Sequence, residues 1–248
     1  SHLSLDENCF YDVLPEFFLY QYLEAKNKIT GHVLETYPRP ENYDFMYNLV
    51  EMLSNIRSQI ISVDINPIKH LLSSVRGMNF HRTLQTVNHV CDYNPWGTIT
   101  GRLSTNANSL PILTMNKEFR ACIKPKNDYL VELDFNAAEL RTLIALTGEE
   151  QPQIDIHEWN RKNIYRNIGS REDAKKRIFA WMYNSKSEDF LSNRAYDKET
   201  VKNKYWDGSR VETDYGRVIE NVDEHHALNY IVQSTTIDMV HEQAYKVY

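Results

Sequence analysis

The stretch VELDFNAAELR, residues 131–141, sets a carboxylate at the end of a β-prone run. Alternation over residues 129–135 predicts a β-strand that ends near Asp134. Asn136 is suited to cap a following helix, and Glu139 stands three positions later, close to a capping-box arrangement. By itself the stretch favours a solvent-exposed acid and a capping glutamate. A rigidly held carboxylate would instead suit a hard cation such as Mg²⁺, which prefers oxygen ligands in octahedral geometry.

The bulk composition is that of an ordinary globular protein, with 42% apolar and 25% charged residues among 248. Cys9, Cys91 and Cys122 are widely spaced and form no CxxC pair, which predicts a reducing compartment and argues against a disulfide framework or a zinc ribbon. No run of 18 apolar residues and no basic-then-apolar leader is present, so we expect no membrane partner. The expected location is the cytoplasm, or the host cytoplasm if the source is viral.

Charge is unevenly distributed along the chain. The formal net charge is −6, yet residues 155–217 carry 14 Lys and Arg against 11 Asp and Glu, a net of +3, and the rest carries −9. A mildly basic segment on an acidic body fits local contact with phosphate, although this signal is weak by itself.

Periodicity predicts an α+β protein in which helices outnumber strands. Helical patterns occupy four stretches: residues 1–75, 136–148, 155–190 and a final helix over 221–248. Short β-prone pieces fill residues 80–135, and a polar, loop-rich interval is expected over residues 192–217.

The sequence SREDAKKRIFAWMY predicts a helix that starts near Arg171, with Ser170 as its N-cap. Arg171, Lys175, Phe179 and Tyr183 recur every four residues and therefore share one side of this helix. The cations come first, at the positive end of the helix dipole, and the aromatic residues follow. A nucleoside triphosphate has a matching arrangement, because its anionic phosphate tail lies at one end and its planar base at the other. An equally weighted alternative is a solvated basic helix whose aromatic residues lie in the core.

Three further pieces carry polar side chains of interest. Arg102 follows a glycine in TGRLST and suits either a tight hairpin or contact with nucleic acid. His157 lies just upstream of the helix that starts near Arg171, where a lone histidine is more often structural than functional. Asn229 and Gln233 are four residues apart in the final helix and suit either a base-pair contact or an ordinary polar seam.

Taken in order, residues 96–248 resemble the family A DNA polymerases of the bacterial DNA polymerase I and phage replicative type. Six elements carry the resemblance: TGRLST, the motif A-like DFNAAELR, DIH, the motif B-like RxxxKxxxFxxxY, YGR and NYIVQSTTID. The short interval between His157 and Arg171 is closer to the phage branch.

The resemblance implies a right-hand polymerase with a partial antiparallel palm sheet, mainly helical fingers and a helical N-terminal segment. Strand 129–135 would belong to the palm. Four parts are expected: a thumb-like segment over 1–95, the first part of the palm over 96–150, fingers over 151–217 and a helix over 218–248 that returns to the palm.

The resemblance also implies a nucleotidyltransferase used in DNA replication, with two Mg²⁺ ions that Mn²⁺ can replace. Asp134 and the carbonyl of Phe135 would bind the metal. His157, Arg171 and Lys175 would clamp the triphosphate of a dNTP, and Lys175 would also protonate the leaving group.

Further roles concern the base, the sugar and the DNA. Phe179 and Tyr183 would flank the incoming base and sugar, and Glu139 would contact Tyr183 and close the space where a ribose 2′-hydroxyl would lie. Three side chains would touch the minor groove of the primer–template DNA: Arg102, Asn229 and Gln233.

The sequence departs from the family pattern at four places. Phe135 to Ala138 replace the usual Tyr-Ser-Gln-Ile of motif A, Asn184 replaces a glycine, and NSLPILT stands at 108–114 where PNLQNIP is expected. The His-Asp-Glu of motif C, which supplies a second metal-binding aspartate, does not occur. A further part of the same chain, or a second polypeptide, is therefore expected to carry the rest of the palm.

Four functions are compatible with these observations. The first is a template-directed DNA polymerase core. The second is a catalytically silent, nucleic-acid-binding part of a divided polymerase. A single-subunit RNA polymerase would use similar residues in motifs A and B. Glu139 argues against this function, because a ribose substrate needs a small residue at that position. A helical Mg²⁺ hydrolase would need a second acid near Asp134, and only Glu132 offers itself.

Overall fold

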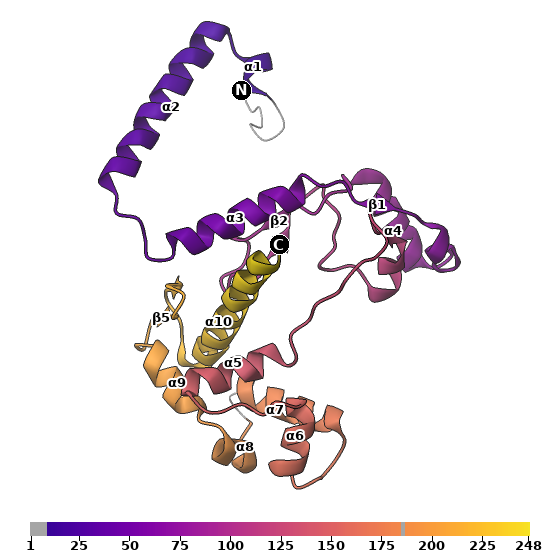
Figure 1. The fold of residues 1–248 in the computed structure, drawn as a ribbon, viewed down its shortest axis with the longest axis vertical. Coiled ribbons are helices and arrows are strands. Elements are labelled where there is room, and N and C mark those ends of the chain that lie inside the picture. The colour runs from indigo at the N-terminus through magenta and orange to yellow at the C-terminus, as the bar shows by residue number, and fades with distance from the viewer. Residues whose placement is uncertain (1–8, 185–186) are drawn as a thin grey trace. The chain divides into compact units, whose positions relative to one another are not determined.

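The computed structural model describes residues 9–184 and 187–248 (Figure 1). It is mostly helical, with small antiparallel sheets of two strands each, so the predicted α+β class is confirmed. The chain separates into two compact units, Ser1–Tyr43 and Asp44–Tyr248. The finer four-part division expected from the sequence stays a prediction.

The first unit contains α1 (Phe10–Val13) and α2 (Glu16–Thr36). Pro15 occupies the N-cap of α2, where its missing N–H costs no helical hydrogen bond. The helix ends at Thr36, and its C-cap Tyr37 has an extended backbone, because Pro38 disfavours a helical backbone at the residue before it. No residue of α2 is buried.

The remaining α-helices are α3 (Tyr43–Arg57), α4 (Val75–Thr86), α5 (Ala138–Thr147), α6 (Ile156–Asn163), α7 (Arg171–Tyr183), α8 (Phe190–Ala195), α9 (Lys198–Tyr205) and α10 (Glu224–Val247). Two 3₁₀ helices are η1 (Asn66–Leu71) and η2 (Lys117–Cys122). The antiparallel strand pairs are β1 (Ser62–Val63) with β4 (Ile123–Lys124), β2 (Tyr93–Asn94) with β3 (Ser104–Thr105), and β5 (Val211–Glu212) with β6 (Val218–Ile219).

The largest hydrophobic core gathers α5, α6, α7, α9 and α10. Helix α10 contacts α5, α7, α9 and β5, and it is buried on more than one side (Figure 1). A buried hydrogen bond of 2.9 Å, from Thr236 to Thr142, joins α10 to α5. A second core forms around η1, α4 and η2, where the rings of Phe80 and Phe119 stack with centroids 4.4 Å apart.

Two segments differ from the expected secondary structure. Residues 82–86, predicted to be β-prone, belong to α4, because Phe80 and Leu84 bury one helical face and Ser74 caps the first turn. The interval 192–217, predicted to be a polar loop, includes the end of α8, all of α9 and strand β5.

The predicted strand over residues 129–135 was wrong. Residues 126–135 make no backbone hydrogen bond to any described part of the chain, and this segment is an irregular connection between β4 and α5 (Figure 1). Tyr129, Val131 and Leu133 are 84%, 80% and 75% exposed. Alternation determines which face a side chain takes, but a strand is stable only beside a paired neighbour. For the same reason the expected palm sheet is not formed by the described residues.

No described helix combines the length and the apolar character needed to cross a membrane.

Candidate functional site

Helix α7 supports the site, and its predicted start and N-cap are confirmed. The backbone N–H of Asp173 donates to the Ser170 hydroxyl at 3.1 Å, and the N–H of Ser170 donates to the Asp173 carboxylate at 2.9 Å. This capping box satisfies two N–H groups that the first turn leaves open. One face of the helix is buried in the core: Ala174, Ile178, Trp181 and Met182. The predicted stripe lies beside this face: Lys175 is exposed and Arg171 half-buried, whereas Phe179 and Tyr183 are half-buried and pack against the core.

His157 lies against the middle of this stripe. It is buried in the first turn of α6, and its ring centroid is 6.0 Å from that of Phe179. Burial lowers the pKa of His157, and the nearby charges of Arg171 and Lys175 lower it further. The imidazole is therefore neutral at neutral pH, and its buried Nδ1 has no hydrogen-bond partner among the described residues.

Lys175 is the exposed cation of the stripe. It forms no ion pair with any residue that the structure describes, although its charge is felt at His157. An ammonium in this position is free to bind an anion without first leaving a carboxylate.

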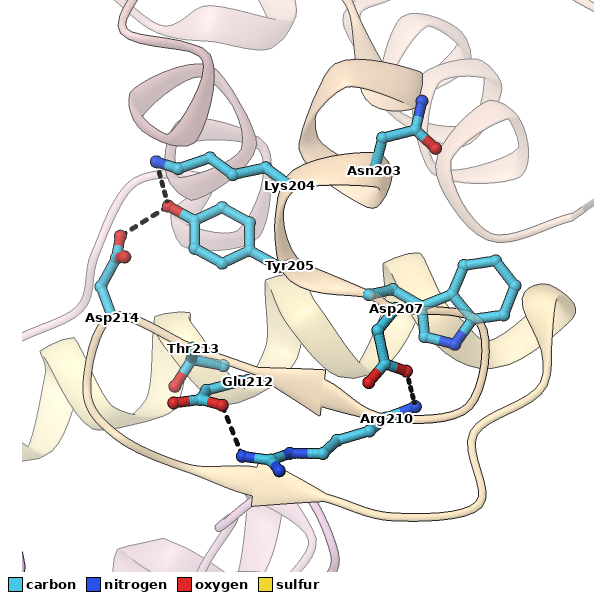
Figure 2. Close-up of a pocket in the computed structure, with 9 residues that line it drawn as sticks. Asn203, Lys204, Tyr205, Asp207, Arg210, Glu212, Thr213 and Asp214 are labelled. Carbon is cyan, nitrogen blue, oxygen red and sulfur yellow. Dashed lines mark hydrogen bonds and ion pairs between the residues drawn. The ribbon is translucent and has the colours of Figure 1, made fainter.

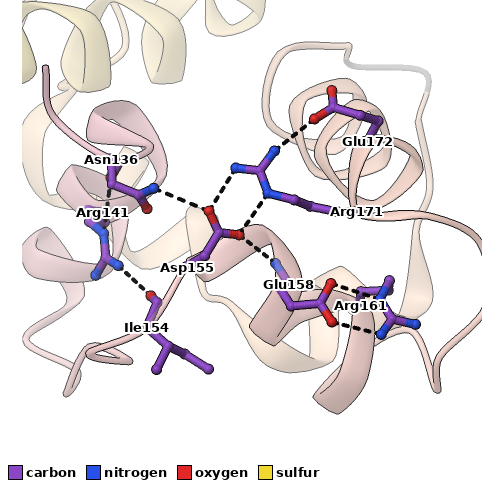
Figure 3. A network of polar contacts seen from close by, with 8 residues as sticks. All are labelled: Asn136, Arg141, Ile154, Asp155, Glu158, Arg161, Arg171 and Glu172. Atoms are coloured by element: carbon purple, nitrogen blue, oxygen red, sulfur yellow. Dashed lines mark hydrogen bonds and ion pairs between the residues drawn. The ribbon is translucent and has the colours of Figure 1, made fainter.

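Arg171 is held by carboxylates at the N-terminal end of α7 (Figure 3). Its Nε and Nη2 donate to Asp155 at 3.1 and 2.7 Å, and its Nη1 donates to Glu172 at 2.7 Å. Asp155 also accepts from the Asn136 amide at 3.2 Å and from the backbone N–H of Glu158 at 2.8 Å. These donors, Arg171 above all, hold the pKa of Asp155 far below its usual value.

The predicted capping role of Asn136 was wrong. Ala137 occupies the N-cap of α5 with φ of 52°, and no side-chain hydrogen bond caps the helix. Asn136 instead connects the start of α5 to Asp155, the N-cap of α6. The local sequence pattern allowed the cap, but the left-handed backbone at Ala137 directs the Asn136 side chain elsewhere.

Glu139 connects two residues at the C-terminal end of the stripe. The Tyr183 hydroxyl donates to one carboxylate oxygen at 2.8 Å, and Nη2 of Arg102 donates to the other at 2.7 Å. The expected contact between Glu139 and Tyr183 is thus confirmed. Burial, followed by the charge of Glu139, raises the pKa of Tyr183, so the phenol stays protonated and donates.

The contacts form one continuous line along α7. Phe179 and Tyr183 lie with ring centroids 6.0 Å apart, so the line runs from Asp155 and Arg171, past His157, to Glu139 and Arg102. Its first half holds Arg171 and Lys175 together with the carboxylates of Asp155 and Glu172, and its second half holds two aromatic rings with a fixed carboxylate. The exposed ammonium of Lys175 is chemically suited to an anion, and the rings are chemically suited to a planar group.

The predicted metal ligands, Asp134 and the Phe135 carbonyl, lie in the exposed connection before α5. The described residues contain no group of three or more His, Cys, Asp or Glu side chains suited to a metal ion. Mg²⁺ often takes one or two carboxylates and completes its shell with water and phosphate, so Asp134 fits as one ligand. One carboxylate does not make a two-ion site, and the residues present fit that group only in part.

Asn229 and Gln233 are half-buried on α10. The Asn229 side-chain oxygen is enclosed and has no hydrogen-bond partner within the described structure. No hydrogen bond among the described residues joins either amide to the line along α7. Their predicted contact with DNA stays a prediction.

Sequence reasoning gave no role to Arg141. Its guanidinium donates to the carbonyls of Asn136 and Ile154 at 3.0 and 2.8 Å (Figure 3) and to the carbonyl of Pro152 at 2.9 Å. These hydrogen bonds attach the loop that precedes Asp155 to helix α5. Sequence spacing carries no signal for them, because each acceptor is a backbone carbonyl.

An open pocket of about 530 Å³ lies between α9 and the β5–β6 hairpin (Figure 2). Lys204 donates to the Tyr205 hydroxyl at 2.8 Å, which donates to Asp214 at 2.6 Å, and Arg210 pairs with Glu212. Most of these polar groups bond to one another, although the buried Nε of Arg210 has no hydrogen-bond partner within the described structure.

No protein-family model matches the sequence, and no curated protein matches it significantly.

Proposed function

We propose that this chain is the nucleotide-binding core of a template-directed DNA polymerase of the family A type, with a partial right-hand fold. It would transfer deoxynucleotidyl groups from dNTPs to a primer 3′-hydroxyl. The observation that carries the proposal is the line along α7, in which cations, a neutral histidine, two rings and a tyrosine-bound glutamate follow one another.

The phosphate end of the proposed site relies on Lys175 and His157. Lys175 pairs with no carboxylate in the part of the chain that the structure describes, so it would contact the triphosphate directly. The neutral imidazole of His157 can donate one hydrogen bond to a phosphate oxygen. Arg171 joins them only after it exchanges Asp155 for phosphate, because its guanidinium is already bound on two edges.

The other end would hold the base and the sugar. Phe179 and Tyr183 offer ring faces for a base. Glu139, fixed by the Tyr183 hydroxyl, fills the space next to that ring, which disfavours a sugar with a 2′-hydroxyl.

Metal ions, when bound, would activate the primer hydroxyl and neutralise charge on the triphosphate. Asp134 and the Phe135 carbonyl would contribute ligands. The described residues complete only part of such a site.

A divided polymerase is the second candidate, in which this chain is catalytically silent alone. The observation that favours it is the segment 129–135, which forms no strand pairing with any described residue and exposes five large apolar side chains: Tyr129, Leu130, Val131, Leu133 and Phe135. A polypeptide that supplied an adjoining strand and the second acid would pair with this segment and extend the palm.

The nucleotide-binding proposal is tested by titrating the full chain with dATP and comparing Lys175→Ala with Lys176→Ala. Both lysines are exposed on α7, but only Lys175 belongs to the stripe. We expect Lys175→Ala to weaken binding about tenfold, and Lys176→Ala to change it less than about twofold. Equal effects of the two substitutions would reject the proposed site.

Primer extension separates the two candidates. Purified chain is mixed with a primed template, dNTPs and MgCl₂. Extension by the chain alone would rule out the divided polymerase, whereas dATP binding without extension supports it. In a completed enzyme, Lys175→Ala should slow nucleotide addition by roughly 10²-fold.

A further inference from the structure

Both oxygens of Glu139 are fixed, and they are fixed by residues far apart in the sequence. Tyr183 donates to Oε2 and Arg102 donates to Oε1, at 2.8 and 2.7 Å. The Glu139 side chain is only 18% exposed, while Arg102 is 52% exposed. A carboxylate held at both oxygens in a partly buried position keeps one rotamer and one charge partner.

The loop that carries Arg102 packs closely against the Arg217 side chain at Gly101. Gly101 has φ of 81°, and a Cβ at this position would lie 2.3 Å from the Arg217 guanidinium. That guanidinium cannot move easily, because it donates to both oxygens of buried Asp238, at 2.9 and 2.6 Å. The Thr98 hydroxyl donates to the Arg102 carbonyl at 2.8 Å and closes the turn.

We propose that Arg102 is a positioning residue that holds Glu139 against Tyr183 and thereby sets the preference for a sugar without a 2′-hydroxyl. This inference rests on the proposed nucleotide site. The loop of Gly101, seated on the Arg217–Asp238 ion pair, determines where the Arg102 guanidinium lies.

The physical reason is the freedom that Glu139 would gain. Without Arg102, one carboxylate oxygen loses its charge-assisted hydrogen bond, and a partly buried charge is left with a single neutral donor. The side chain can then rotate toward solvent and leave the space beside the Tyr183 ring open. A ribose 2′-hydroxyl would meet less resistance there.

The experiment measures the affinity of the full chain for dATP, ATP and inorganic tripolyphosphate. Tripolyphosphate reports the phosphate end alone, and the ratio of the dATP to the ATP affinity reports the sugar. We expect the parent to prefer dATP by roughly tenfold. Arg102→Ala should reduce this preference to about twofold or less, with little change for tripolyphosphate.

Two further variants separate positioning from loss of structure. Arg102→Lys keeps a cation that can reach Glu139, so it should retain most of the preference. Gly101→Ala forces the loop away from Arg217 without altering Arg102 itself, so it should reproduce the effect of Arg102→Ala. Thermal unfolding of each variant shows whether the fold persists.

The outcomes distinguish this inference from the nucleotide site on which it rests. If the parent binds neither dATP nor ATP more tightly than tripolyphosphate, the proposed nucleotide site fails. If Glu139→Ala abolishes the preference and Arg102→Ala leaves it at the parental ratio, the positioning role alone fails. Weaker binding of primer–template DNA with an unchanged ratio would likewise assign Arg102 to DNA contact only.

Discussion

At the N-terminal end of α7, the ion pair between Arg171 and Asp155 is partly exposed to solvent: the two side chains are 41% and 30% exposed. At the C-terminal end, Glu139 is 18% exposed and binds both Tyr183 and Arg102. Each end therefore pairs a carboxylate with a residue expected to contact a nucleotide, but the two carboxylates differ in their surroundings.

The difference indicates two different tasks. The Arg171–Asp155 pair is the more exposed of the two, so water and a phosphate can compete for it more easily than for the Glu139 contacts. A partly buried carboxylate with both oxygens occupied is costly to disturb, so Glu139 keeps a fixed position. Under the proposed function, this difference in burial suits the first end to phosphate capture and the second to discrimination between sugars.

The largest expected effect removes the support that both ends share. Ile178 is fully buried under the middle of α7, and Ile178→Ala should lower the free energy of unfolding by about 2–5 kcal/mol. Urea denaturation measures this loss, and Ile178→Val should cost only about 0.5–1.5 kcal/mol. A loss below about 1 kcal/mol for the alanine variant would mean that the two ends do not depend on a common core.

The next effect concerns the exposed end. Asp155→Asn should raise the affinity for tripolyphosphate about five- to tenfold, because Arg171 loses its competing carboxylate while the asparagine can still cap α6. Glu158→Gln is the matched control on the same helix, since Glu158 pairs with Arg161 and Lys162 instead. Unchanged or weaker binding by Asp155→Asn would show that the ion pair does not compete with phosphate.

The Asp155 carboxylate should also make the free energy of unfolding depend on pH in the acidic range. The pKa of Asp155 is depressed below its ordinary 3.8 in the folded chain, so its contribution is present above that pH and is lost as the pH falls below it. Asp155→Asn should therefore lose less stability than the parent on acidification, as measured by urea denaturation at several pH values.

A smaller effect concerns the buried end. Tyr183→Phe should lower the free energy of unfolding by about 1 kcal/mol and reduce the preference for dATP over ATP, because Glu139 loses one donor. Tyr165→Phe is the control, since its hydroxyl bonds Ser192 at 2.8 Å in the core. Tyr165→Phe should lower the free energy of unfolding by a similar amount and leave the preference for dATP over ATP unchanged. An unchanged ratio for Tyr183→Phe would contradict a role for this hydrogen bond.

The smallest effect concerns His157, which lies between the two ends. Its lowered pKa means that the folded chain binds fewer protons than the unfolded chain, so stability falls as the pH drops through about 6.5. His157→Gln should flatten this dependence between about pH 7.5 and pH 5.5. His241→Gln should also flatten it, because burial lowers the pKa of His241, but only His157→Gln should weaken tripolyphosphate binding. Equal binding by both variants would remove His157 from the phosphate end.

The sequence by itself determined the local parts of the site. Ser170 and Asp173 define the start of α7, and a four-residue spacing places the stripe on one side, because capping and helical periodicity depend only on neighbours along the chain. The approximate extent of α10 followed from the same kind of pattern.

Only the tertiary structure decided which partners these side chains have. Arg102 and Glu139 are 37 residues apart, and Asp155 and Arg171 are 16 apart, so no periodicity could predict either pair. Alternation over residues 129–135 predicted a strand that does not form, and side chains of both predicted faces are exposed, because strand formation needs a neighbour that no described segment provides. Local patterns depend on the chain's own neighbours, whereas pairing depends on where distant segments meet.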